Sequence, residues 1–212
     1  LVRRDAKFNA MAVNINTGKF IDPLNGLGDI ENKQISAANP DAFSDDPLRM
    51  LRMVNFASRF GFDIEPNTMK MIQENADRIK EIPPQRILIE FDKIIKKGDV
   101  YRGAILLKKT GLLKSIFGGV GEITTTDKWN RVKTIGEYIF LLSRNIVDNP
   151  AEFFKRNLKG DIYTYKEILA IQYAFENENI TNIIEARTIA HNMFVKHPKS
   201  LESDILPDII KK

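Results

Sequence analysis

The stretch that decides the fold is Asp45-Asp46-Pro47-Leu48-Arg49-Met50-Leu51-Arg52-Met53-Val54-Asn55-Phe56-Ala57-Ser58-Arg59-Phe60. An aspartate followed by proline is a typical helix start, because the carboxylate caps free amides and proline has no amide hydrogen to leave unbonded. Gly61 follows, and glycine is a typical helix end because it adopts the left-handed conformation readily. The stretch therefore predicts a helix from residue 46 to about residue 60.

At 100° per residue this helix has an apolar side and a polar side. The apolar side holds Met50, Met53, Val54, Phe56, Ala57 and Phe60, and the polar side holds Arg52, Asn55, Ser58 and Arg59. Asp46 and Arg49 fall on the apolar side, where charges are costly unless they are paired. Because they are three positions apart, they can pair with each other or bind a common ligand.

Two interpretations of Asp46 and Arg49 are open. In the structural interpretation, Asp46 caps the helix and Arg49 pairs with it. In the functional interpretation, the carboxylate accepts and the guanidinium donates, so together they complement an edge with an amino donor beside a ring-nitrogen acceptor. Adenine and cytosine have this edge, whereas uracil and guanine present a carbonyl and a ring N–H. The pair can therefore select A and C without a template.

The sequence after residue 40 predicts further helices. They are expected over 66–79, 84–97, 100–109, 129–145, 161–176, 180–195 and 200–210. Residues 11–15 and 20–21 flank the turn signal Asn16-Thr17-Gly18-Lys19 and predict a short β-hairpin, the edge of a sheet. We therefore predict a mainly α fold with a small N-terminal β-hairpin.

The composition excludes several kinds of site. The 212 residues include no cysteine, which excludes disulfides, Cys-ligated zinc and thiol nucleophiles. The two histidines, His191 and His197, have the wrong spacing for a helical metal-binding pair, so we predict no metal there. Trp129 and Phe140 are expected in the core rather than stacked on RNA bases. No apolar run reaches the roughly 20 residues of a membrane-spanning helix, and we expect a cytoplasmic protein without a membrane segment.

The net charge of +4 conceals a local basic excess. Residues 86–114 contain eight Lys or Arg and only three Asp or Glu. Such a window is either a solvated helix surface or a surface that attracts a phosphate backbone.

Four stretches, in the same order and spacing, carry a family resemblance. They are Arg3-Arg4-Asp5 with Asn9-Ala10; Ile21-Asp22-Pro23 with Gly26-Leu27 and Asp29; Asp46-x-x-Arg49-x-x-Arg52 with Phe56-Ala57 and Arg59-Phe60-Gly61-Phe62; and Ile82-Pro83-Pro84-Gln85-Arg86-Ile87 with Glu90-Phe91. They resemble, in turn, the ribose motif, the hinge motif, the nucleotide-selecting helix and the neck segment of the bacterial-type tRNA nucleotidyltransferase (CCA-adding enzyme) and poly(A) polymerase family.

The resemblance implies an organisation and an activity. Residues 1–36 would be the C-terminal remnant of a nucleotidyltransferase head, 37–115 a helical neck and 116–212 a helical body. The activity would be template-independent addition of CCA or A to RNA 3′ ends, with ATP and CTP as substrates. In the family, two carboxylates upstream of the ribose motif bind Mg²⁺. Because the chain begins after them, we expect no catalytic residue and no metal ligand in it, and no activity of the chain alone.

The resemblance also implies roles for individual residues. Asp5 would accept hydrogen bonds from the ribose hydroxyls, with Arg4 and Asn9 beside it; Asp46 and Arg49 would face the base, and Arg52 the triphosphate. The expected RNA-binding residues, for the acceptor arm of tRNA, are Arg86, Lys93, Lys96, Lys97, Lys108 and Lys109. The chain departs from the family at Ala6-Lys7, Leu24-Asn25, Asp45 and Asn55, and none of these departures touches the base-reading pair.

The sequence leaves two alternatives open. The first is a poly(A) polymerase that makes longer A tails. The second is a non-catalytic helical module that binds RNA. The sequence makes no prediction about the oligomeric state.

Overall fold

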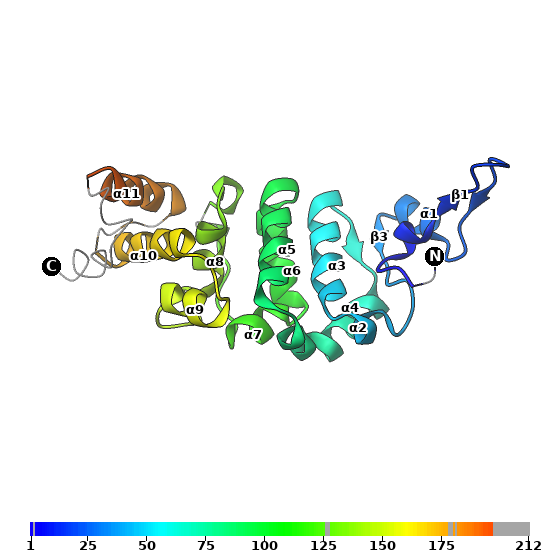
Figure 1. Cartoon of the computed structure of the whole chain (residues 1–212), viewed down its shortest axis with the longest axis horizontal. Helices are drawn as coiled ribbons and strands as arrows, with labels where there is room; N and C mark the ends of the chain where they lie inside the picture. Colours follow the sequence, from blue (N-terminus) through cyan, green and yellow to red (C-terminus); the bar gives the residue numbers. More distant parts are fainter. Residues whose placement is uncertain (2, 126–127, 178–179, 181, 197–212) are drawn as a thin grey trace. The chain divides into compact units, whose positions relative to one another are not determined.

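The helix expected from residue 46 is α3, Leu48–Phe60, in the computed structural model of the chain (Figure 1). Pro47 precedes it, and Gly61 ends it with φ of 69°, in the left-handed region that glycine tolerates best. The next helix, α4 (Pro66–Asn75), starts at a proline, and the Glu65 carboxylate accepts from the amides of Asn67 and Thr68. The glycine end of α3 and the proline start of α4 are confirmed, but the predicted cap of α3 is wrong: Pro47, and not Asp46, occupies the N-cap position.

The structure describes residues 1, 3–125, 128–177, 180 and 182–196. It divides into two units, Leu1–Ile116 and Phe117–Lys212. The fold is mainly α, as predicted. The division into a head remnant, a neck and a body stays a prediction.

In the first unit, short elements precede the longer helices. The remaining helical elements are η1 (Lys7–Ala10), α1 (Gly26–Glu31), α2 (Ala42–Asp45), η2 (Ala76–Glu81), α5 (Pro84–Lys97), α6 (Val100–Lys109) and α7 (Leu112–Phe117), the last of which ends at the first residue of the second unit. The predicted helix over 66–79 is therefore an α-helix followed by a 3₁₀ turn.

Two small sheets lie in the first unit. The predicted hairpin exists but is shorter: β1 (Ala12–Val13) pairs antiparallel with β2 (Phe20–Ile21). An unpredicted parallel pair joins β3 (Gln34–Ile35) to β4 (Asp63–Ile64), which follows α3. Strands of two residues are too short to show a hydrophobic period, so only the folded chain reveals them.

The polar side predicted for α3 is wrong at two positions. Asn55 is 5% exposed and Ser58 is 3% exposed. Helix α5 packs against this side of α3, and the Asn55 side-chain amide donates to the Glu90 carboxylate at 2.8 Å. Phe60, predicted on the buried side, is 43% exposed and contacts the rings of Phe8, Phe56 and Phe62.

The second unit is helical in its described part. Its elements are η4 (Trp129–Arg131), α8 (Ile135–Ser143), α9 (Pro150–Asn157), α10 (Ile162–Asn177) and α11 (Ile183–Lys196). Trp129 and Phe140 are each 2% exposed, which confirms their place in the core. Helix α9 was not predicted, although Asn149 caps it and Pro150 begins it. The helix predicted over 200–210 lies outside the described residues, as does His197.

No helix in the described part of the chain is both long enough and apolar enough to cross a membrane.

Candidate nucleotide pocket

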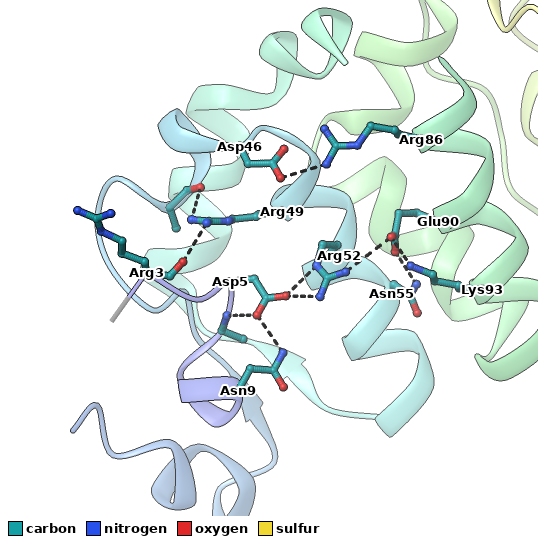
Figure 2. A network of polar contacts seen from close by, with 12 residues as sticks. Arg3, Asp5, Asn9, Asp46, Arg49, Arg52, Asn55, Arg86, Glu90 and Lys93 are labelled. Atoms are coloured by element: carbon teal, nitrogen blue, oxygen red, sulfur yellow. Dashed lines mark hydrogen bonds and ion pairs between the residues drawn. The ribbon is translucent and has the colours of Figure 1, made fainter. Parts of the chain in front are cut away.

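An open pocket of about 250 Å³ lies in the first unit where three segments meet (Figure 2). The N-terminal segment contributes one wall, the start of α3 a second, and the first turn of α5 a third. The lining residues are Arg3, Arg4, Asp5, Asp46, Leu48, Arg49, Arg52 and Arg86.

Asp5 and Arg52 form the most tightly held ion pair of the pocket. Asp5 Oδ2 lies 2.7 Å from Arg52 Nε and 2.5 Å from Arg52 Nη2, so two nitrogens bind one carboxylate oxygen. Asp5 Oδ1 accepts from the Asn9 side chain at 2.9 Å and from the Ala6 amide at 2.8 Å. Burial alone opposes ionisation, but these hydrogen bonds and the Arg52 charge outweigh it and lower the pKa of the Asp5 carboxyl.

Arg52 also approaches a second carboxylate, that of Glu90 in α5. Arg52 Nη1 lies 3.9 Å from Glu90 Oε1, and the Glu90 side chain is only 3% exposed. Glu90 accepts in addition from Lys93 at 2.7 Å and from Asn55 at 2.8 Å. As Figure 2 shows, a polar network therefore runs from the N-terminal segment through α3 to α5.

Asp46 and Arg49 line the same pocket but are not bound to each other. Asp46 Oδ1 accepts from the Leu48 amide at 3.2 Å, and Asp46 Oδ2 lies 3.2 Å from Arg86 Nη2. Arg49 donates to the carbonyl oxygens of Ala42 and Arg3, at 3.2 and 2.9 Å. The hydrogen bond from Leu48 is of the capping kind that the structural interpretation predicts, whereas the ion pair it predicts between Asp46 and Arg49 does not form.

The pocket carries a positive excess. It is lined by five arginines and two aspartates. Arg52 is paired with Asp5, and Arg86 with Asp46. Arg3 and Arg4 are exposed, and neither has an ion-pair partner among the described residues. Guanidinium groups in such a position attract phosphate, which they can bind through two nitrogens at once.

The structure brings most of the predicted nucleotide-binding residues together. Arg4, Asp5, Asp46, Arg49 and Arg52 line the pocket, and Asn9 lies behind Asp5 as its hydrogen-bond donor. Arg3 and Arg86 were missed as pocket residues. Arg3 was visible in the sequence as a neighbour of Arg4, but nothing in the sequence pairs Arg86 with a residue 40 positions away.

The predicted RNA-binding residues have different surroundings. Arg86 and Lys93 belong to the polar network just described. Lys96 pairs with Asp92 at 2.8 Å. Lys97, Lys108 and Lys109 are exposed at the ends of α5 and α6, without an ion-pair partner in the described chain. At 1.5 Å per residue, Lys97 is about 16 Å along α5 from Arg86, so Lys97 lies away from the pocket wall.

The described residues do not provide a metal site. No group of three His, Asp or Glu side chains among them is arranged to hold an ion. The hinge-motif aspartates have local partners instead: Asp22 accepts from the amides of Gly26 and Leu27, and Asp29 from the amide and hydroxyl of Ser36. Both pocket carboxylates are paired with arginine. His191 is exposed on α11.

Two family models match the chain. Residues 1–36 match the model described as "Poly A polymerase head domain". Residues 61–122 match the model described as "Probable RNA and SrmB- binding site of polymerase A".

Curated relatives agree with these models. A CCA-adding enzyme of Bacillus licheniformis is 38% identical over 124 residues, which is 58% of this chain and 31% of the relative. A CC-adding tRNA nucleotidyltransferase of Synechocystis sp. is 37% identical over 95 residues, which is 45% of this chain and 23% of the relative. The chain thus spans less than a third of the length of these relatives.

Solved structures show the same fold. A Bacillus stearothermophilus CCA-adding enzyme in complex with CTP has a TM-score of 0.70 and 28% identity, over 83% of this chain and 46% of that one. A Thermotoga maritima CCA-adding enzyme complexed with tRNA has a TM-score of 0.70 at 18% identity, over 89% of this chain and 54% of that one. Motifs, family models and fold agree: over the matched segments the chain is similar to members of the tRNA nucleotidyltransferase and bacterial poly(A) polymerase family.

Proposed function

We propose that this chain carries the nucleotide-selecting and RNA-binding part of an enzyme that adds C and A to the 3′ end of tRNA, with CTP and ATP as substrates and without a template. The pocket lined by Asp46 and Arg49 selects the base. The lysines at the ends of α5 and α6 hold the phosphate backbone of the tRNA acceptor arm.

The observation that carries this proposal is the way in which Asp46 and Arg49 are held. Each is fixed by other groups, Asp46 by Arg86 and Arg49 by two carbonyl oxygens and, at 3.9 Å, by Asp45, so neither neutralises the other. A carboxylate with spare lone pairs and a guanidinium with spare N–H groups therefore face one pocket. This combination complements the amino donor and ring-nitrogen acceptor of cytosine and adenine.

The other pocket residues suit the rest of a nucleoside triphosphate. Asp5 is an acceptor for a ribose hydroxyl, and Arg3 and Arg4 supply positive charge for the phosphates. Mg²⁺ would activate the 3′ hydroxyl and bind the triphosphate. The paired aspartates of this pocket do not fit that ion, and we assign it to no residue described here.

A second candidate, a poly(A) polymerase, is favoured by the descriptions of the family models, one of which names poly A polymerase and the other polymerase A. The pair of Asp46 and Arg49 suits an enzyme that adds only A equally well as one that adds both C and A. The two candidates differ in the product rather than in the pocket.

The test is incorporation by the complete gene product on a tRNA that ends at the discriminator base. Each of the four labelled nucleoside triphosphates is supplied alone and then together, and the products are sized on a gel. We expect C followed by A, and then a stop. Long A runs would indicate the polymerase instead, and incorporation of U or G as efficient as that of C and A would refute selection by Asp46 and Arg49.

A further inference from the structure

The Asp5 carboxylate has no spare acceptor site in the structure. A carboxylate offers about four lone-pair positions, and Asp5 fills them with Arg52 Nε and Nη2 on one oxygen and with Asn9 and the Ala6 amide on the other. A ribose hydroxyl can reach Asp5 only if one of these donors leaves. Which donor leaves decides what Arg52 does when a nucleotide is bound.

The four hydrogen bonds differ in what they cost to break. The Ala6 amide is fixed by the backbone directly after Asp5. The Arg52 interaction joins two full charges through two nitrogens, and such pairs are about twice as strong as hydrogen bonds of neutral groups. Asn9 is neutral, half-buried and linked to Asp5 by a single side-chain bond. A hydroxyl therefore replaces the Asn9 amide most cheaply, on Oδ1, and leaves Arg52 in place on Oδ2.

Arg52 itself is held on three sides. Asp5 lies 2.5 Å from its Nη2, Glu90 lies 3.9 Å from its Nη1, and its guanidinium carbon lies 5.3 Å from the centre of the Phe56 ring. A phosphate bound to Arg52 would have to displace Asp5 or approach both carboxylates. Arg3 and Arg4 line the same pocket, have no ion-pair partner in the described part of the chain, and offer phosphate a better site.

We propose that Arg52 is a positioning residue that acts through Asp5 on the choice between ribose and deoxyribose, and not a ligand of the triphosphate. This inference rests on the proposed nucleotide pocket. Arg52 keeps Asp5 ionised and fixes Oδ2, so that Oδ1 faces the 2′ hydroxyl. Loss of Arg52 therefore weakens binding of ribonucleotides and leaves binding of 2′-deoxyribonucleotides almost unchanged.

The test compares equilibrium binding of ATP and dATP to the complete gene product and to its Arg52→Ala variant, by titration calorimetry. We expect the ratio of the two affinities to fall by about tenfold in the variant, the size of a hydrogen bond to a charged group, through weaker binding of ATP. Equal reductions for ATP and dATP, or reductions that disappear when AMP replaces ATP, would overturn the proposal in favour of phosphate binding by Arg52.

Three further variants make the experiment specific. Arg59→Ala removes an exposed arginine seven residues along the same helix and is expected to change neither affinity. Arg52→Lys keeps the charge without the two-nitrogen geometry, so it should lower the ratio of the two affinities by a smaller factor. If circular dichroism shows that the alanine variant does not fold, the lysine variant replaces it in the test. Asn9→Ala should raise the ratio, because the ribose hydroxyl then binds Asp5 without first displacing the Asn9 amide, whereas binding of dATP is unchanged.

The outcomes also separate this inference from the proposed function. A wild-type protein that prefers ATP to dATP but adds no nucleotide to tRNA would contradict the proposed function alone. A wild-type protein that binds both equally would overturn the inference even if it adds CCA.

Discussion

At the scale of single residues, the pocket depends on carboxylates that stay charged although they are shielded from water. The Asp5 side chain is 7% exposed, a degree of burial that by itself favours the neutral acid. Hydrogen bonds from Asn9, Arg52 and Ala6 reverse this preference and lower the pKa of Asp5. The folded protein therefore gains stability from the ionised form.

Replacing Asp5 by Asn tests this coupling. Because the pKa is lower in the folded chain, the contribution of Asp5 is complete above its ordinary value of 3.8 and is lost as the pH falls through the lower folded value. We expect Asp5→Asn to reduce the free energy of unfolding by about 1–3 kcal/mol at pH 7 and by less at pH 3, which lies below the ordinary pKa of 3.8. Urea titrations of both proteins at the two pH values measure the difference, and an equal reduction at both would contradict it.

Replacing Asp46 by Ala tests the base-reading role. The variant removes the acceptor that we propose for the amino group of C or A, and it also frees Arg86. We expect the preference for C and A over U and G to fall by about tenfold or more, as measured by kcat/KM with each nucleotide. Asp41→Ala, an exposed residue beside α2 with no capping bond, is the matched control. A variant that merely unfolds would favour the capping interpretation.

At the scale of elements, the C-terminal ends of α3 and α5 approach each other closely. Gly98 ends α5 with φ of −111°, so its backbone does not require glycine. A Cβ atom there would overlap the buried Ser58 hydroxyl, which has no hydrogen-bond partner among the described residues. Space, and not backbone conformation, is the reason for glycine at this position.

Gly98→Ala is therefore expected to destabilise the protein by about 1–3 kcal/mol through overpacking. Ser58→Ala should be nearly neutral by itself, because the hydroxyl makes no hydrogen bond within the described part of the chain. In the double variant the clash is relieved, so the two changes should be strongly non-additive. Urea unfolding of the four proteins measures this coupling, and simple additivity would contradict the packing explanation.

In the second unit, an ion pair joins α11 to the start of α8. The buried Glu137 completes the capping box of Thr134 and also pairs with Arg187, which donates to the Arg131 carbonyl as well. Glu167 lies beside this pair. Burial raises the pKa of the Glu167 carboxyl, a hydrogen bond from Thr134 lowers it, and the Glu137 charge raises it; the net shift is upward. Arg187 is thus the cation that balances two neighbouring carboxyl groups.

Arg187→Gln should leave Glu137 buried without its cation and destabilise this unit by roughly 3 kcal/mol at pH 7. Trp129 is the only tryptophan and lies in η4, which α11 contacts, so its fluorescence reports unfolding of this unit. Arg156→Gln, which removes an exposed arginine paired with Glu152, should cost less than about 1 kcal/mol. Equal effects of the two changes would contradict the importance of burial.

At the scale of the whole molecule, the basic excess predicts RNA binding that depends strongly on salt. We expect the replacement of Lys96, Lys97, Lys108 and Lys109 by Glu to weaken tRNA binding. The slope of log K against log salt concentration should become shallower by about one unit for each phosphate that these lysines neutralise. Reversing four exposed lysines elsewhere, Lys19, Lys70, Lys133 and Lys155, changes the net charge equally and is the control. If both variants bind tRNA equally weakly, net charge and not this surface governs binding.

How far the sequence predicts the fold depends on the signals within each element. The caps and prolines around α3, α4 and α5 are local, and these helices start within two residues of the expected positions. Helices α1 and α2 have six and four residues, too few to show a helical period, and they were missed. The motifs likewise predicted Asp5, Asp46 and Arg49 as site residues, but not their partners, because those lie up to 47 residues away.

The sequence by itself determined the helical class, the starts of α4 and α5 and the family motifs, and it predicted the pair Asp46 and Arg49, since each depends on neighbouring residues and on their hydrogen-bonding chemistry. Only the tertiary structure decided that Arg86 holds Asp46, that Arg52 holds Asp5 and that Asn55 and Ser58 are buried. The physical reason is that these interactions join separate segments: Asp5 and Arg52 are 47 residues apart, and nothing local in either segment specifies the other.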